Sequence, residues 1–301
     1  MMTIPLTFQK TIIGMHKEKG EKWLQELPDF LLNWQKQQEA TLLSPFELSY
    51  NYVAPVLLSN GRSAVFKISY PSKEFLREVQ TYQAFQQGKF VRMLDCSLQD
   101  SWVLMEYLSP GTPLKESGLS DLENVSIAAG ILPTLWSAPD FSNFPTVREW
   151  SKGLERLRSR FSGNTGPLPA HCVEKAEKLY DELFASEREV HLLHGDLHHG
   201  NILFDGDQGW TAIDAKGVIG EKEYDCIQFM INELQDQQDR LSVLRDRISR
   251  FCDVLQLDRE RMIAWGFCHS VLSAAWCIED GQNSWEWGIG CAGLFDELMQ
   301  E

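Results

Sequence analysis

The first third of the chain passes from a helical to a strand-like pattern of apolar positions. Its opening segment repeats apolar residues at the spacing of one helix face. These residues are Trp23, Leu24, Leu27, Leu31 and Trp34. Pro28 lies inside the pattern and predicts either a second short helix or a kink in one long helix. We expect residues 1–41 to form a helical extension that packs against the segment after it.

Residues 42–70 are rich in β-branched and aromatic positions and predict three strands. The corresponding stretches are TLLSPFEL, YVAPVLL and SAVFKIS. Asn60-Gly61 joins the last two, and because this pair tolerates positive φ it favours a tight antiparallel hairpin. A helix over KEFLREVQTYQAFQ and a further strand pair, VRMLDCSL and SWVLMEYL, are predicted to follow.

The rest of the chain has helical patterns except around Leu192. This order of elements predicts an α+β, protein-kinase-like two-lobed fold. A small antiparallel-sheet N-lobe with one main helix would span residues 42–108 and include a hinge at its end. A larger, mostly helical C-lobe with a catalytic loop would span residues 109–301.

Composition narrows the kinds of partner. A net charge of −15 disfavours nucleic acid and anionic lipid, because both would be repelled before short-range contacts formed, but it permits a cationic small molecule. No segment approaches the roughly 20 apolar residues of a membrane span. The seven cysteines form no C-x-x-C pair and suit reduced thiols. We expect a soluble, cytoplasmic protein without nucleic-acid or membrane partners; its oligomeric state stays open.

The run LLHGDLHHGNILF has the form of a phosphotransferase catalytic loop. In such a loop a carboxylate accepts or orients the proton of the attacking hydroxyl, and an amide oxygen a few residues later helps to hold Mg²⁺. Asp196 and Asn201 have this spacing, and His194 precedes Asp196 as in His-Arg-Asp. Asp214 ends the strand-like WTAID and is the second candidate metal ligand, although Ala-Lys-Gly rather than Phe-Gly follows it. We assign Asp196 and His194 to catalysis.

The nucleotide half of the site is predicted upstream. Lys67 lies in AVFKI on the third strand, and Glu78 lies on the following helix, turned toward its interior face. Each alone would ordinarily be a solvated surface residue, and only their joint order points to a phosphate-binding pair. The turn between the first two strands would place Ser49 near the nucleotide, but it has no glycine where protein kinases have a Gly-rich loop.

A transition-metal site is the main alternative for the loop, because His194, Asp196, His198 and His199 are all potential ligands. A dinuclear hydrolase needs further ligands on other strand ends, and no second histidine cluster exists in the sequence. We therefore reject this alternative and leave the roles of His198 and His199 open.

With these motifs the chain resembles the aminoglycoside phosphotransferases, in particular the branch of streptomycin and hydroxyurea phosphotransferases. The similar segments are WLQELP, YNYVAPV, AVFKI, VRMLD, LMEYLSPGTPL, LLHGDLHHGNIL, WTAIDAKGVIGEKEYD and CHSVLSAAW. The resemblance implies ATP with Mg²⁺ as cofactors and Asp196 as base. Lys67 would bind the nucleotide phosphates, Asn201 and Asp214 would bind the metal, and a hinge of Glu106, Tyr107 and Leu108 would bind adenine. We interpret Asp225 as a structural helix cap.

The acceptor is less well defined by sequence. The resemblance places it against the C-terminal helices, where aromatic and acidic residues that suit a guanidinium or ammonium group gather. The candidates are Trp276, Glu279, Asp280 and Glu286. Ordinary packing of the aromatics with solvated carboxylates explains the same pattern equally well. Two rival functions stay open: a kinase of a metabolite such as choline or a thiosugar, and a catalytically silent pseudokinase that serves as a binding module.

Overall fold

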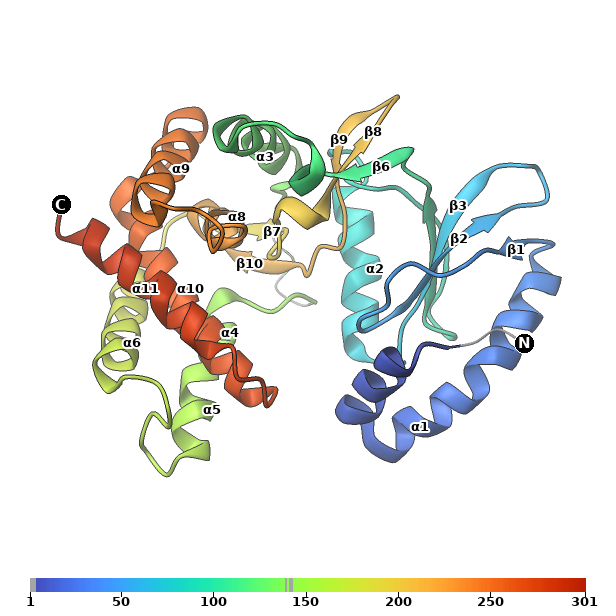
Figure 1. Ribbon diagram of the computed structural model, residues 1–301, viewed down its shortest axis with the longest axis horizontal. Helices are drawn as coiled ribbons and strands as arrows, with labels where there is room; N and C mark the ends of the chain where they lie inside the picture. The colour runs from blue at the N-terminus through green and yellow to red at the C-terminus, as the bar shows by residue number, and fades with distance from the viewer. Residues whose placement is uncertain (1–3, 139, 141–142) are drawn as a thin grey trace. The chain divides into compact units, whose positions relative to one another are not determined.

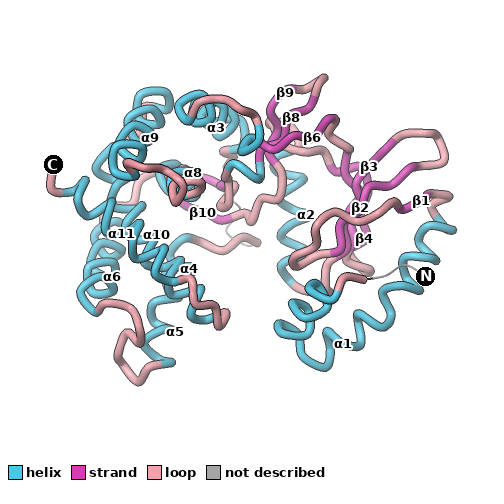
Figure 2. Tube along the Cα trace, in the orientation of Figure 1, coloured by secondary structure: helices cyan, strands magenta, loops and turns pink. Residues whose placement is uncertain are grey.

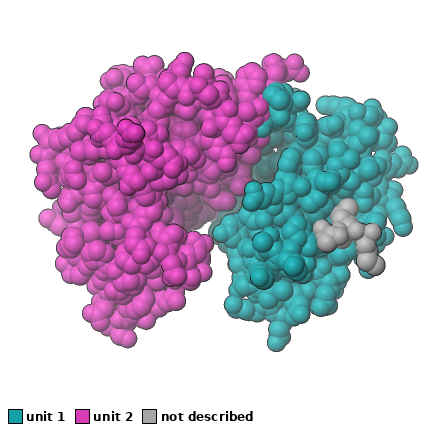
Figure 3. All heavy atoms as spheres, viewed as in Figure 1, with its two compact units in different colours: residues 1–86, 90–111 teal, residues 87–89, 112–301 magenta. Residues whose placement is uncertain are grey.

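The computed structural model describes residues 4–138, 140 and 143–301. The chain forms two compact units (Figure 3). Unit 1 comprises residues 1–86 and 90–111, and unit 2 comprises residues 87–89 and 112–301. Unit 1 therefore contains the predicted helical extension together with most of the predicted N-lobe.

Unit 1 begins with α1 (Leu6–Gln37), which consists of two helical segments joined at a kink. The chain stays helical through Pro28, and the only non-helical backbone inside α1 lies at Lys17, with φ 54° and ψ −135°. The alternative of a second helix that starts at Pro28 is therefore wrong, whereas a kink at Pro28 stays a prediction. Leu27 and Leu31 are buried with Trp34 against the sheet of unit 1, and the Trp34 ring lies 4.2 Å from that of Phe66, centroid to centroid. This confirms that the N-terminal helix packs on the segment after it.

The sheet of unit 1 is antiparallel, with strand order β1-β2-β3-β5-β4. Figure 1 labels β1, β2 and β3 of this sheet, and Figure 2 also labels β4. Its strands are β1 (Thr41–Leu42), β2 (Tyr52–Leu57), β3 (Ser63–Ile68), β4 (Met93–Ser97) and β5 (Trp102–Glu106). The first predicted strand is regular only at its start, Thr41–Leu42; beyond it, separate backbone hydrogen bonds from Leu43 to Pro55 at 2.8 Å and from Phe46 to Val53 at 3.0 Å still join the segment to β2. The β2–β3 hairpin forms as predicted, with Gly61 at φ 79°.

Helix α2 (Lys73–Phe85) is the main helix of unit 1. Ser72 caps it by accepting a hydrogen bond from the Phe75 N–H, which satisfies one of the unpaired donors of the first turn. Strand β6 (Pro110–Pro113) runs across the boundary of the two units.

Unit 2 is predominantly helical (Figure 2). Its helices are η1 (Leu114–Glu116), α3 (Asp121–Leu135), α4 (Val147–Ser151), α5 (Gly153–Arg160), α6 (Ala170–Ala185), η2 (His199–Asn201), α7 (Lys222–Asp225), α8 (Ile227–Ile231), α9 (Arg240–Leu255), α10 (Arg259–Glu279) and α11 (Trp285–Met299). Its short strands are β7 (His191–Leu193), β8 (Ile202–Asp205), β9 (Gly209–Ala212) and β10 (Val218–Gly220). The α+β class, with an antiparallel N-terminal sheet and a helical C-terminal part, is as predicted.

Two antiparallel strand pairs position the chemistry of unit 2. β7 pairs with β10, and β8 pairs with β9. The loop from β7 to β8 carries Asp196, and the loop from β9 to β10 carries Asp214. Because the β8–β9 pair is nested in the chain between β7 and β10, these two loops lie at the same end of the paired strands.

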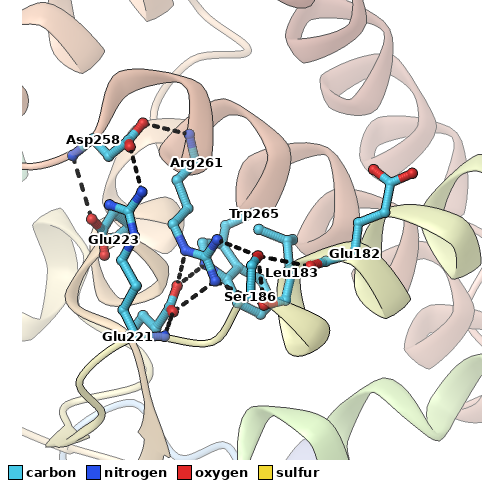
Figure 4. A network of polar contacts seen from close by, with 9 residues as sticks. Glu182, Leu183, Ser186, Glu221, Glu223, Asp258, Arg261 and Trp265 are labelled. Atoms are coloured by element: carbon cyan, nitrogen blue, oxygen red, sulfur yellow. Dashed lines mark hydrogen bonds and ion pairs between the residues drawn. The ribbon is translucent and has the colours of Figure 1, made fainter.

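Helix α10 forms the centre of unit 2. It is the one helix among the described residues that is long and apolar enough to cross a membrane, but 72% of its most apolar window is buried inside the protein. Buried polar contacts fix its N-terminal end to the β10–α7 segment (Figure 4). The Glu221 carboxylate pairs with the Arg261 guanidinium and accepts from the Trp265 indole at 2.8 Å. Because each buried charge has several partners, this end of α10 is held in one position.

Candidate active site

His194 organises the catalytic loop. Its ring is buried, with Nε2 3.0 Å from the Ile213 carbonyl oxygen, while Nδ1 accepts from the Asp196 N–H at 3.2 Å. Burial lowers the pKa of His194 to about 3, so the ring is neutral. Both ring nitrogens are therefore engaged in holding Asp196 against the end of β9, which is a positioning role. The predicted catalytic role of His194 stays a prediction.

The Asp225 side chain also anchors the catalytic loop. Its buried carboxylate accepts from the N–H groups of His194 at 3.1 Å and Gly195 at 2.8 Å, and from the Trp136 indole at 3.0 Å. The interpretation of Asp225 as a helix cap is wrong, because it ends α7 and binds a loop 30 positions earlier in the chain. Gly195 has φ 77°, a conformation that favours glycine at this turn.

The two candidate metal ligands have suitable surroundings. The Asn201 side-chain NH₂ donates to the Asp196 carbonyl oxygen at 3.0 Å, which leaves Oδ1 as the atom able to ligate a cation. Asp214 follows β9 with φ 57°, and its side chain is 42% exposed. Two oxygen donors of this kind fit Mg²⁺, which usually keeps water and substrate phosphates as its other ligands. Within residues 4–138, 140 and 143–301 there is no cluster of three or more His, Cys, Asp or Glu suited to a metal.

Lys216 connects the carboxylates of the two loops. Its Nζ lies 3.8 Å from Asp196 Oδ2 and 3.9 Å from Asp214 Oδ2. The structure thus brings Asp196, Asn201 and Asp214 into one region of unit 2. In the sequence, Lys216 is only a departure from the Phe-Gly pattern, and no local spacing indicates that it contacts both carboxylates.

Within unit 1, Lys67 and Glu78 meet as expected. Lys67 Nζ lies 2.8 Å from Glu78 Oε1, and both side chains are largely buried. Of the predicted hinge, Glu106 is buried and accepts from the Arg92 N–H at 2.9 Å, Tyr107 is exposed, and Leu108 is buried. The adenine-binding role of these hinge residues stays a prediction.

Ser49 lies in the irregular segment between β1 and β2 and is exposed. Its predicted contact with the nucleotide stays a prediction.

Comparison with known proteins decides the family. The family model described as aminoglycoside/hydroxyurea antibiotic resistance kinase matches residues 34–281, which is most of the chain. This protein belongs to that family. It is a small-molecule kinase with an alcohol group as acceptor.

The relatives show how far the likeness extends. Streptomycin 6-kinase of Streptomyces glaucescens is 27% identical over 289 residues, covering 93% of this chain and 92% of that protein. A thermostable mutant of the aminoglycoside phosphotransferase APH(4)-Ia, solved with ADP and hygromycin B, has a TM-score of 0.65 at 13% identity and covers 91% of this chain and 98% of that chain. Choline kinase LicA from Streptococcus pneumoniae has the same TM-score and identity over 91% and 99%. The shared fold therefore does not determine which acceptor the protein uses.

The remaining loop histidines of this kinase are structural. His198 Nδ1 accepts from the Gly200 N–H at 3.0 Å at the start of η2, and burial lowers its pKa to about 4. The His199 ring stacks on Phe229 with centroids 3.9 Å apart, and burial lowers its pKa to about 3. Both rings are neutral at pH 7.

The predicted acceptor residues lie at the C-terminal end of α10 and in the first turn of α11. The Glu279 carboxylate is engaged by Arg156, with Nη2 at 3.0 Å, so its charge is already paired. Asp280 is the C-cap of α10 and Glu286 lies in the first turn of α11, and both are exposed. The acidic residues are thus explained by local pairing and solvation, and their assignment to the acceptor stays a prediction.

Trp276 has a partner that sequence reasoning missed. Its ring meets that of Trp150, from α4, edge to face, with centroids 5.7 Å apart and an interplanar angle of 84°. The Trp150 ring also borders the catalytic loop, since a Cβ on Gly195 would lie 3.2 Å from its Cη2. Trp150 therefore lies beside the residue that precedes Asp196, and Trp276 packs against Trp150. No local pattern relates positions this far apart in the chain.

The pH dependence of activity follows from the surroundings of Asp196. Burial and the neighbouring Asp214 charge raise the pKa of the Asp196 carboxyl to about 6, against the opposing effect of Lys216. In its predicted role as base, a protonated Asp196 could not take the acceptor's proton, so we expect kcat/KM for the acceptor to fall about tenfold per unit below pH 6. A steady-state pH profile measures this. A profile that is flat down to pH 5 would contradict it.

Proposed function

We propose that this kinase transfers the γ-phosphate of ATP, with Mg²⁺, to a hydroxyl of a cationic small molecule of the aminoglycoside type, with streptomycin as the first candidate. The observation that carries the proposal is the meeting of Asp196, Asn201 and Asp214 at two adjoining loops of unit 2. Family membership supplies the reaction class, and the streptomycin kinase among the relatives supplies the candidate acceptor.

In the proposed mechanism Asp196 orients the acceptor hydroxyl and takes its proton as the oxygen attacks the γ-phosphorus. Asn201 and Asp214 would hold Mg²⁺, which when bound neutralises charge on the phosphates. His194 and Asp225 keep the Asp196 backbone in place through the hydrogen bonds at 3.2, 3.1 and 2.8 Å. Much of the rate enhancement would then come from positioning.

A cationic acceptor is supported by the aromatic pair of Trp150 and Trp276. Guanidinium and ammonium groups bind favourably over indole rings, and Trp150 of this pair adjoins Gly195 of the catalytic loop. Both indoles are partly exposed. Hydroxyurea is small and uncharged, so this pair favours an aminoglycoside over hydroxyurea.

An acceptor panel tests the proposal. Release of ADP would be followed with streptomycin, hydroxyurea, hygromycin B and choline at equal concentrations, and the product would be checked by mass spectrometry for one added phosphate. We expect the highest kcat/KM for streptomycin. A higher value for choline would overturn the acceptor assignment. ATP binding without transfer to any acceptor would favour the pseudokinase.

Replacing Trp150 by Ala should raise KM for the cationic acceptor about 2–30-fold, the range that corresponds to a cation–π contact of about 0.5–2 kcal/mol. KM for ATP should stay unchanged, because the indole adjoins the acceptor side of the loop in this proposal. Steady-state kinetics with each substrate varied in turn measures both values.

A matched control for Trp150→Ala is Trp287→Ala, which removes an indole whose ring faces the Arg240 guanidinium at 5.4 Å. This control should leave the acceptor KM within about twofold of wild type. Equal effects of the two substitutions would argue against an acceptor site at Trp150.

A further inference from the structure

Lys216 lies between the catalytic-site carboxylates but has no role in the mechanism proposed above. Its ammonium lies within 4 Å of two carboxylates from different loops, at 3.8 Å from Asp196 and 3.9 Å from Asp214. The side chain is 51% exposed, so a ligand in solution can reach it. An accessible cation thus stands between the candidate base and a candidate metal ligand.

The backbone of the loop sets this position. The Lys216 N–H donates to the His194 carbonyl oxygen at 2.9 Å, and the Gly217 N–H donates to the same oxygen at 3.3 Å. Gly217 has φ 66° and Asp214 has φ 57°, so the chain turns sharply on both sides of Lys216. These hydrogen bonds connect the two loops at His194. They fix the backbone of Lys216, so its side chain begins close to Asp196.

An ordinary surface pair is built differently. Lys178 and Glu182 lie one turn apart on α6 at 3.7 Å, with both side chains more than half exposed. Such a pair follows from helix spacing alone and contributes little to stability. Lys216 instead contacts carboxylates of two loops through a tertiary arrangement.

The charges suggest what this lysine does when nucleotide binds. One ammonium faces two carboxylates, so the group retains a net negative charge that favours a cation such as Mg²⁺ at Asp214. Once Asp214 is neutralised by a cation, the attraction that holds the flexible side chain there weakens. A γ-phosphoryl group near Asp196 then becomes the nearest strong acceptor for the ammonium donors.

Resting on the proposed function, we propose that Lys216 is a further catalytic residue whose ammonium binds the γ-phosphoryl group during transfer and bridges Asp196 and Asp214 when nucleotide is absent. In the transfer step the acceptor oxygen forms a bond to the γ-phosphorus. The bond from this phosphorus to the β,γ-bridging oxygen breaks, and ADP leaves with the electron pair. The hydroxyl proton goes to Asp196. Lys216 keeps its protons and stabilises the equatorial oxygens by charge and hydrogen bonding.

The test separates γ-phosphate contact from general folding effects. Lys216→Met keeps most of the side chain's length and removes its charge, whereas Lys216→Arg keeps the charge. Calorimetry with Mg²⁺ would compare AMP-PNP, which has a γ-phosphoryl group, with ADP, which lacks one. We expect Lys216→Met to weaken AMP-PNP binding about tenfold while ADP binding stays within twofold, and Lys216→Arg to recover part of the loss. Lys178→Met is the control and should match wild type for both nucleotides.

Kinetics supplies the second readout. Lys216→Met should lower kcat about 100-fold, the size expected when one preorganised cation of a transition state is lost. Its unfolding midpoint should stay near wild type, because the side chain is half exposed. Equal losses for AMP-PNP and ADP, or a kcat within threefold of wild type, would overturn the inference.

The nucleotide comparison needs no acceptor, so it distinguishes failure of this inference from failure of the acceptor assignment. Selective loss of AMP-PNP binding supports the role of Lys216 even if streptomycin is not the substrate. A wild-type protein that binds neither nucleotide would overturn the proposed function and this inference together.

Discussion

Asp196→Asn is expected to lower kcat by about 10²–10⁴-fold while AMP-PNP binds as tightly as to wild type. The amide has nearly the shape of the carboxyl group but cannot accept the hydroxyl proton. The backbone contact with His194 at 3.2 Å does not involve the side chain and should persist. Coupled release of ADP measures kcat, and calorimetry measures nucleotide binding.

Asp207→Asn provides the matched control for this substitution. Asp207 lies exposed in the turn between β8 and β9 and belongs to the same segment of unit 2. The control should retain kcat within about twofold. Near-normal turnover in Asp196→Asn would remove Asp196 from its assigned role, whatever the resemblance to other kinases.

Asp225→Ala should reduce both stability and turnover. It leaves the N–H groups of His194 and Gly195 and the Trp136 indole N–H without their acceptor. A buried donor without a partner costs about 1–3 kcal/mol, so we expect a loss of about 3 kcal/mol or more and a decrease of roughly 5–10 °C in the unfolding midpoint. Turnover should fall about 100-fold per folded molecule, because the loop that carries Asp196 is no longer fixed.

Arg261→Met separates these two effects. Its removal leaves the buried Glu221 carboxylate without its cation and should cost about 3–5 kcal/mol (Figure 4). This network includes none of the residues assigned to catalysis. At a temperature where both variants are folded, Arg261→Met should keep near-normal kcat and Asp225→Ala should not. Equal activities would show that Asp225 contributes to stability alone.

The elements of unit 1 show which structural features a local sequence pattern can predict. The β2–β3 hairpin, α2 and the β4–β5 pair lie where periodicity and turn residues placed them. The contact between Lys67 and Glu78 agrees with their expected strand position and helix face, because these two features together limit where the side chains point. These features depend on neighbours close in sequence or on a regular period.

The errors arose where tertiary packing overrides local preference. Residues after Leu42 look like a strand but keep only separate backbone hydrogen bonds to β2. The helical backbone of α1 continues through Pro28, where Leu27 and Leu31 on either side are packed on the sheet. The carboxylate of Asp225 satisfies loop donors rather than the end of its own helix. Arg156 from α5 pairs with Glu279, a contact that no local pattern indicates, and the role of Glu279 toward the acceptor stays a prediction.

The sequence by itself determined the kinase-like class of this protein, the candidate base Asp196 and the oxygen donors Asn201 and Asp214, because short fixed spacings within two loops encode them. Only the tertiary structure decided that Lys216 lies between two carboxylates, that Asp225 holds the catalytic loop and that Trp150 adjoins it. Such contacts join segments that are brought together by burial of a common core. Their partners are therefore selected by packing in three dimensions rather than by spacing along the chain.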